Sequence, residues 1–166
     1  MDEGLLILRM VGGPVMAAHG TQKLFGWFGG YGLAGTAGFF EMLGFRPGRV
    51  FAAAASTAEI LGGLLIAAGL FGPIGPALVF ATMIVAAVSV HWHNGLFAAT
   101  NGIEVPLLFA AISATLALTG PGAYSLDAAT GLAALWTHEV AWGALAVGAI
   151  GGVANLVARR AAPMEA

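Results

Sequence analysis

Residues 50–71 read VFAAAASTAEILGGLLIAAGLF, a stretch in which Glu59 is the only charged residue. About 20 consecutive apolar residues are enough for a helix to cross the hydrocarbon of a bilayer. Ala55, Ser56, Gly62 and Gly63 surround the carboxylate with small side chains, which allow a second helix to approach closely. The stretch therefore predicts a membrane helix that packs tightly against a neighbour and shields one acid from lipid.

The composition of the whole chain supports this interpretation. Of its 166 residues 59% are apolar and only 8% are charged, and the mean hydropathy is +0.90. Soluble domains carry about 25% charged residues. We therefore expect an all-α integral membrane helix bundle whose solvent is the lipid bilayer.

Two counts exclude several function classes. The chain contains no cysteine, so disulfide exchange, thiolate zinc sites and iron–sulfur clusters are excluded. A net charge of -2 with only six lysines and arginines gives no basic surface for nucleic acid. Any redox function therefore needs a partner or a bound cofactor.

Five apolar runs approach membrane-spanning length, at about 4–28, 50–71, 74–92, 103–119 and 138–157. Pro73 and Pro76 border a very short link, which predicts an antiparallel hairpin of the second and third helices. A brief interfacial helix is expected in 29–48, with Thr36 near its start. The fifth helix is expected to begin near Thr137, and the loop before it is expected to hold no further element.

Charge bias predicts the orientation. With five crossings, one face of the membrane carries Lys23, Arg46, Arg49, Arg159 and Arg160, whereas the loops of the other face carry no lysine or arginine. The positive-inside rule places that face in the cytoplasm. We therefore expect a multi-pass protein of the bacterial inner membrane with its N-terminus outside and its C-terminus in the cytoplasm.

The first run contains charges, but they share one helical face. Arg9, Gly12, Met16, His19 and Lys23 follow one another at intervals of three or four residues and form one stripe. An ion pair between Arg9 and Glu59 is the simplest way to keep both charges away from lipid. Two interpretations stay open, a structural ion pair and a relay for protons or substrate.

Parity of the crossings brings a second group of polar residues together. The end of the first helix, the end of the third and the start of the fourth must lie at one membrane face. Parity gathers nine polar residues at that face: His19, Gln22, Lys23, Glu41, His91, His93, Asn94, Asn101 and Glu104. The predicted polar site takes His19, Lys23, His91 and Glu104 from this group and adds Glu59, near the middle of the second helix.

Each member of this group also has a plain structural interpretation. His91 and His93 point about 200° apart on a continuous helix, so they can bind one ion or haem only if the helix ends between them, and no metal is expected. Glu104 and Asn101 have the spacing of a capping box. Lys23 is placed where it can extend to the lipid headgroups.

The fifth run carries small residues every four positions, at Ala144, Gly148 and Gly152. Such a stripe allows close backbone packing. Its partner is either another helix of the bundle or a second protomer in a homo-oligomer.

Several segments together resemble the DoxX family of small bacterial membrane proteins. They are HGTQKLFG from His19, GTAGFF from Gly35, AEILGGLL from Ala58, residues 83–91, NGIE from Asn101 and GPGAYSLD from Gly120. The resemblance spans about residues 5–127 and implies a four-helix membrane core over 1–127. Residues 128–166 then form a linker, an added fifth transmembrane helix and a polar tail. Val105 departs from the family, which often has an aromatic residue after the glutamate.

The resemblance also implies a redox environment, because relatives include a subunit of a thiosulfate:quinone oxidoreductase. We expect a subunit or accessory of a quinone-linked or thiol- and sulfur-linked membrane redox system, with a membrane redox partner protein. The chain would hold no intrinsic cofactor, and its polar site would orient a quinone head group or handle protons. A carrier for a small polar solute and a non-catalytic scaffold are the alternatives.

Overall fold

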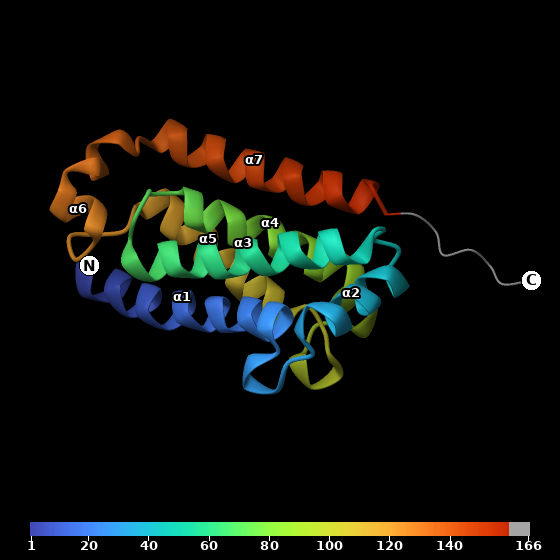
Figure 1. The fold of residues 1–166 in the computed structure, drawn as a ribbon. Coiled ribbons are helices and arrows are strands. Elements are labelled where there is room, and N and C mark those ends of the chain that lie inside the picture. Colours follow the sequence, from blue (N-terminus) through green and yellow to red (C-terminus); the bar gives the residue numbers. More distant parts are fainter. Residues whose placement is uncertain (160–166) are drawn as a thin grey trace, which may run out of the picture.

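The computed structural model describes residues 1–159, and those residues form helices and connecting loops without strands (Figure 1). The expectation of an all-α bundle is confirmed. Its five long helices are α1 (Asp2–Phe25), α3 (Gly48–Ala68), α4 (Ile74–Ala86), α5 (Glu104–Thr119) and α7 (His138–Val157).

Three helices of the described chain are long and apolar enough to cross a membrane: Gly48–Ala68, Ile74–Asn94 and His138–Val157. The second of these joins α4 to a π-helical turn, η2 (Ala87–His91), and a 3-10 turn, η3 (Trp92–Asn94). α5 is apolar but shorter, and α1 carries charges at both ends and at Arg9. Five crossings therefore stay a prediction.

Short elements occupy the connections. η1 (Trp27–Gly29) and α2 (Gly32–Met42) lie between α1 and α3, so the expected short helix that contains Thr36 is present. η4 (Ala98–Thr100) precedes α5. The expectation of an element-free loop before α7 is wrong, because α6 (Leu126–Thr130) and η5 (Leu132–Leu135) lie there.

α6 forms because its first turn is capped. The Ser125 hydroxyl accepts a hydrogen bond from the Ala128 amide, at 3.1 Å. Asp127 is fully buried and accepts from the Phe71 and Gly72 amides at 2.9 and 2.6 Å. α6 is thus fastened to the link between α3 and α4, and it crosses the expected boundary at residue 127.

Glycine contacts set the register between α1 and α3. A methyl group added at Gly13 would lie 2.6 Å from the Gly63 carbonyl oxygen, and one at Gly20 would lie 2.6 Å from that of Ser56. Real side chains do not tolerate such distances, so the two backbones can approach this closely only without them. The small residues around Glu59 therefore have the close helix contact that the sequence predicts.

The small-residue stripe of α7 packs inside the chain. Added methyl groups at Gly148 and Gly152 would lie 2.7 and 2.9 Å from the Ala77 and Ala81 carbonyl oxygens of α4. Figure 1 shows α7 lying lengthwise along the bundle beside α4. A homo-oligomer through Ala144, Gly148 and Gly152 would have to use a face that α4 already covers.

The ends of the bundle agree with the parity argument. Arg159, after α7, donates from Nε to the Leu43 carbonyl oxygen at 2.9 Å, beside the α2–α3 connection. At the opposite end, the Asp2 carboxylate accepts from the Ala123 amide at 2.8 Å. Arg160, also assigned to the first face, lies outside the described residues.

Candidate functional site

A cavity of about 980 Å³ lies among α2, α3, the α4–η2 segment and the C-terminal half of α7. Most of its wall is apolar and includes Phe39, Phe40, Phe51, Leu78 and Val85. Three of the five residues predicted as a polar site also line it: Lys23, Glu59 and His91. Ligand cavities in proteins commonly combine such an apolar wall with a few polar groups.

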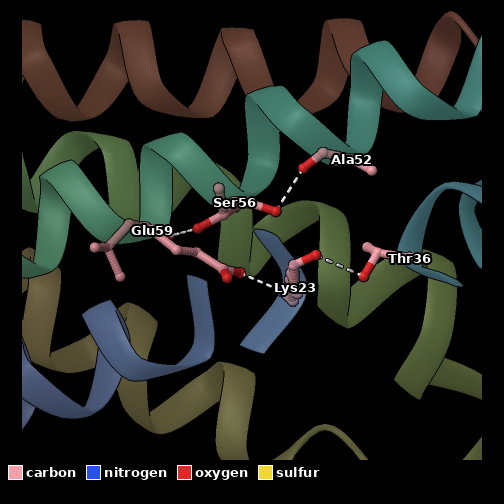
Figure 2. Close-up of polar contacts among 7 residues, drawn as sticks. Lys23, Thr36, Ala52, Ser56 and Glu59 are labelled. Atoms are coloured by element: carbon pink, nitrogen blue, oxygen red, sulfur yellow. Dashed lines mark hydrogen bonds and ion pairs between the residues drawn. The ribbon is translucent and has the colours of Figure 1, made fainter. Parts of the chain in front are cut away.

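Lys23 and Glu59 form an ion pair at this wall (Figure 2). The Lys23 ammonium donates to Oε1 of Glu59, and the glutamate side chain is 2% exposed whereas the lysine side chain is 33% exposed. The second carboxylate oxygen, Oε2, is buried and has no hydrogen-bond partner among residues 1–159. One acceptor of a buried charged group is therefore unsatisfied, which is costly in a protein interior.

The predicted contact between Arg9 and Glu59 is wrong, because both groups have other partners. Arg9 is 3% exposed and donates to the Ile66 and Ala67 carbonyl oxygens at 3.0 Å each. Its Nη1 also donates to the Pro121 and Tyr124 carbonyl oxygens, at 2.5 and 3.1 Å. Arg9 therefore caps the C-terminal end of α3 and ties it to the loop after α5.

Further hydrogen bonds hold the backbone around the ion pair. The Thr36 hydroxyl donates to the Lys23 carbonyl oxygen at 3.1 Å and so fastens α2 to the last turn of α1. The Ser56 hydroxyl, fully buried one turn before Glu59, donates to the Ala52 carbonyl oxygen at 2.6 Å. As Figure 2 shows, the Lys23–Glu59 pair joins α1 to α3 and the Thr36 bond joins α2 to α1, whereas the Ser56 bond lies within α3.

His91 ends the π-helical turn on another wall of the cavity. Its Nδ1 lies 2.8 Å from the Asn101 carbonyl oxygen, which can only accept, so Nδ1 carries the proton. In the neutral ring Nε2 is then an acceptor. π-helical turns are frequent at functional sites because they redirect side chains.

His19 and Glu104 do not line the cavity. The His19 ring packs edge-on against Phe109 of α5, with 6.2 Å between ring centroids. Glu104 accepts from the Ala98 amide at 2.7 Å and thereby caps η4. The predicted capping box is wrong, because Asn101 has a left-handed backbone and no side-chain capping bond to α5.

Sequence reasoning missed several residues of this wall. Thr82 and Ser89 place hydroxyls on it, and their hydrogens are used by the Val79 and Val85 carbonyl oxygens at 2.8 and 2.6 Å. Asn155 of α7 lines it as well. Thr82 and Ser89 lie seven residues apart, a helical periodicity that could have revealed both.

Groups of three or more histidine, cysteine, aspartate or glutamate side chains suited to a metal ion do not occur within residues 1–159. His93, in η3, is exposed and does not line the cavity. The cavity wall thus combines one ion pair, one imidazole and several hydroxyl and amide groups with a large apolar surface.

The fold and the cavity define a helical membrane-bundle protein with a buried polar site. The chain belongs to the DoxX family, whose family model matches residues 4–92. The match includes Lys23, Glu59 and His91 and ends before α5, so the resembling segments after residue 92 lie outside it. No curated protein and no solved structure matches the chain.

Proposed function

We propose that this DoxX family protein binds the head group of a membrane quinone in the cavity, as a subunit or accessory of a quinone-linked or thiol- and sulfur-linked redox system. One observation carries the proposal. A largely apolar cavity of about 980 Å³ has an ion pair and an imidazole on its wall.

The residues present fit such a molecule. An isoprenoid tail and a ring match the aromatic and aliphatic wall, which includes Phe39, Phe40 and Phe51. The carbonyl oxygens of the ring need hydrogen-bond donors, which the Lys23 ammonium supplies, whereas Glu59 and His91 offer acceptors to the hydroxyl groups of the reduced ring. When bound, a quinone would supply the electron-accepting chemistry, while these three residues would bind and orient its head group.

Electrons would come from a partner protein, since the chain lacks cysteine for a thiol or iron–sulfur centre. The proposal places the protein in the bacterial inner membrane with its N-terminus outside and its C-terminus in the cytoplasm. Supporting this orientation, Arg159 lies beside the α2–α3 connection that carries Arg46 and Arg49.

The test compares histidines inside and outside the cavity. Membranes from a deletion strain are assayed for quinone reduction after complementation with wild type, His91→Ala or His19→Ala. We expect wild type and His19→Ala to restore the rate and His91→Ala to fail at equal expression. Full restoration by His91→Ala, or by an empty vector, would contradict the proposal.

The competing functions give different results in further assays. Uptake of a polar solute into proteoliposomes, with no effect on quinone reduction, would support a carrier. Full function of a double variant, Glu59→Gln with Lys23→Gln, would support a scaffold, because the ion pair would then only specify packing.

A further inference from the structure

We propose that Lys23 forms a covalent imine with a long-chain aldehyde held in the cavity, with Glu59 as its acid–base partner and counter-ion. The proposal goes beyond quinone binding and does not depend on it. It rests on a partly exposed amine at the wall of a large apolar cavity, in direct contact with a buried carboxylate. Lysine amines in such surroundings condense with carbonyl compounds.

Lys23 is the only lysine in the chain, since the other five of its six lysines and arginines are arginine. A guanidinium keeps its proton in proteins, whereas the amine of lysine can lose it and become a nucleophile. A guanidinium would also hold a carboxylate through two hydrogen bonds, so ion pairing alone does not require lysine. The one cationic side chain that can attack a carbonyl group therefore lines the cavity.

The reacting form of lysine is the neutral amine, and Glu59 is placed to produce it. The Lys23 ammonium donates to Oε1 of Glu59, whose side chain is 2% exposed. Two charges in an apolar surrounding lose much of their hydration, which is costly. Transfer of the proton from Nζ to Oε1 removes both charges, so the neutral pair is accessible as a minor form. The attacking amine thus needs no base from solvent.

The reaction needs only these two residues and the aldehyde. The neutral Nζ attacks the carbonyl carbon, and a proton of the nitrogen passes to the carbonyl oxygen to give a carbinolamine. The Glu59 carboxylic acid protonates the hydroxyl group, which leaves as water while the carbon–nitrogen double bond forms. The product is a protonated imine beside the Glu59 carboxylate, so the ion pair is restored. One water is released for each aldehyde bound, and no oxidant or reductant takes part.

The wall decides which carbonyl compound fits. Phe39, Phe40, Phe51 and Leu78 line the cavity with apolar groups, which favour a hydrocarbon chain. A keto acid would need a second cation for its carboxylate, and Lys23 is the only lysine or arginine on the described wall. An apolar chain also excludes water, which slows hydrolysis of the imine. The ligand class is therefore an uncharged aldehyde on a long aliphatic chain.

A lysine that only extends to the lipid headgroups would also react with an aldehyde dissolved in the bilayer. The two cases differ in the effect of Glu59. If the carboxylate only pairs with the ammonium, its removal frees the amine and labelling rises. If it takes the proton and returns it to the leaving hydroxyl, its removal slows labelling.

The experiment traps the imine in the full chain, reconstituted in phosphatidylcholine nanodiscs, whose lipids carry no primary amine. Decanal or propanal is added, sodium borohydride reduces the imine to a stable secondary amine, and peptide mass spectrometry locates the alkyl group. The amino terminus is the internal reference, because Met1 is 94% exposed and lies outside the cavity. Lys23→Arg keeps the charge and should show only the terminal adduct.

With wild type we expect decanal to label Lys23. The ratio of this adduct to the terminal adduct should be at least about tenfold higher for decanal than for propanal, because the longer chain buries more apolar surface. Glu59→Gln should slow labelling at least about tenfold, through loss of the acid–base group. Ala55→Phe, which fills the cavity one turn before Glu59, should also lower labelling, whereas Thr57→Phe, exposed and off the cavity wall, should not.

Absence of the Lys23 adduct with decanal, or unchanged or faster labelling in Glu59→Gln, would overturn the proposal. Equal labelling of Ala55→Phe and wild type would overturn it as well, because the aldehyde would then reach the lysine from the lipid. The comparison of Ala55→Phe with Thr57→Phe decides the matter even if Glu59→Gln does not fold. The histidine variants test quinone binding separately.

Discussion

Lys23, in the last turn of α1, forms its ion pair with Glu59 near the middle of α3, and this pair links the packing of the two helices to the cavity. Because Glu59 is almost completely buried, its charge depends on the lysine for compensation. Removing one member of such a pair costs more than removing both.

The first prediction concerns the stability of this pair. Lys23→Met should lower the free energy of unfolding by about 3 kcal/mol, because it leaves a buried carboxylate without a counter-ion. The double variant, Lys23→Met with Glu59→Gln, should recover at least about half of that loss. Unfolding by sodium dodecyl sulfate in mixed micelles measures both. Strictly additive losses in the double variant would contradict coupling between the two residues.

The second prediction concerns the glycine contacts between α1 and α3. Gly13→Ala should destabilise the protein by about 2 kcal/mol or more, because the added methyl group would overlap the Gly63 carbonyl oxygen. Gly143→Ala in α7 is the control, since no atom lies within 4 Å of an added methyl group there. In the control, alanine should raise stability by roughly 0.5 to 1 kcal/mol through its better helix propensity.

The decisive result is a lower free energy of unfolding for Gly13→Ala together with a higher one for Gly143→Ala. The same unfolding assay measures both variants. An equal change at Gly13 and Gly143 would show that α1 and α3 do not approach as closely as the structure indicates.

The helices could be predicted from sequence because apolar length and small-residue spacing are local properties. The 74–92 and 138–157 runs coincide closely with Ile74–Asn94 and His138–Val157. Parity alone placed Lys23 and His91 at one end of the bundle. Both line the same cavity.

The partner of Glu59 could not be predicted, because Arg9 and Lys23 lie on the same stripe of α1 and spacing does not rank them. The register between α1 and α3 decides which of the two residues meets Glu59. With Gly13 against Gly63 and Gly20 against Ser56, Arg9 lies opposite the last turn of α3, where free carbonyl groups accept its hydrogens. The long side chain of Lys23 then reaches Glu59. That register depends on three-dimensional glycine contacts which single-helix patterns do not specify.

The packing position of α7 could not be predicted from the sequence either. Its stripe of small residues left two partners open, and nothing in residues 138–157 indicates that Asn155 lines a cavity with α2 and α3. The cavity is formed by elements distant in the chain. Its existence therefore depends on how the helices pack.

The third prediction concerns Arg9, which makes four hydrogen bonds to carbonyl oxygens. Arg9→Lys keeps the charge but has a single nitrogen, which cannot reach carbonyl groups on both α3 and the loop after α5. We expect a loss of about 2 to 3 kcal/mol in unfolding free energy. Arg49→Lys, at an exposed position, should change stability by less than about 0.5 kcal/mol. Equal stability of the two variants would show that the geometry of the guanidinium is unimportant.

The fourth prediction concerns the end of α7, which forms part of the cavity wall. The Arg159 guanidinium donates to the Leu43 carbonyl oxygen and lies 5.4 Å from the centre of the Phe45 ring. Arg159→Ala should remove about 1 kcal/mol of contact energy and allow the last turns of α7 to open more often. Hydrogen exchange measured by mass spectrometry should accelerate severalfold over residues 151–157.

Val157→Ala is the matched control, because Val157 is 79% exposed and its side chain should contribute little to this packing. Binding of a short-tail quinone should weaken in Arg159→Ala and stay unchanged in the control, since Gly151, Gly152 and Asn155 line the cavity from this part of α7. If exchange in 151–157 were the same in Arg159→Ala as in wild type, the arginine would not be what holds α7 against the α2–α3 connection.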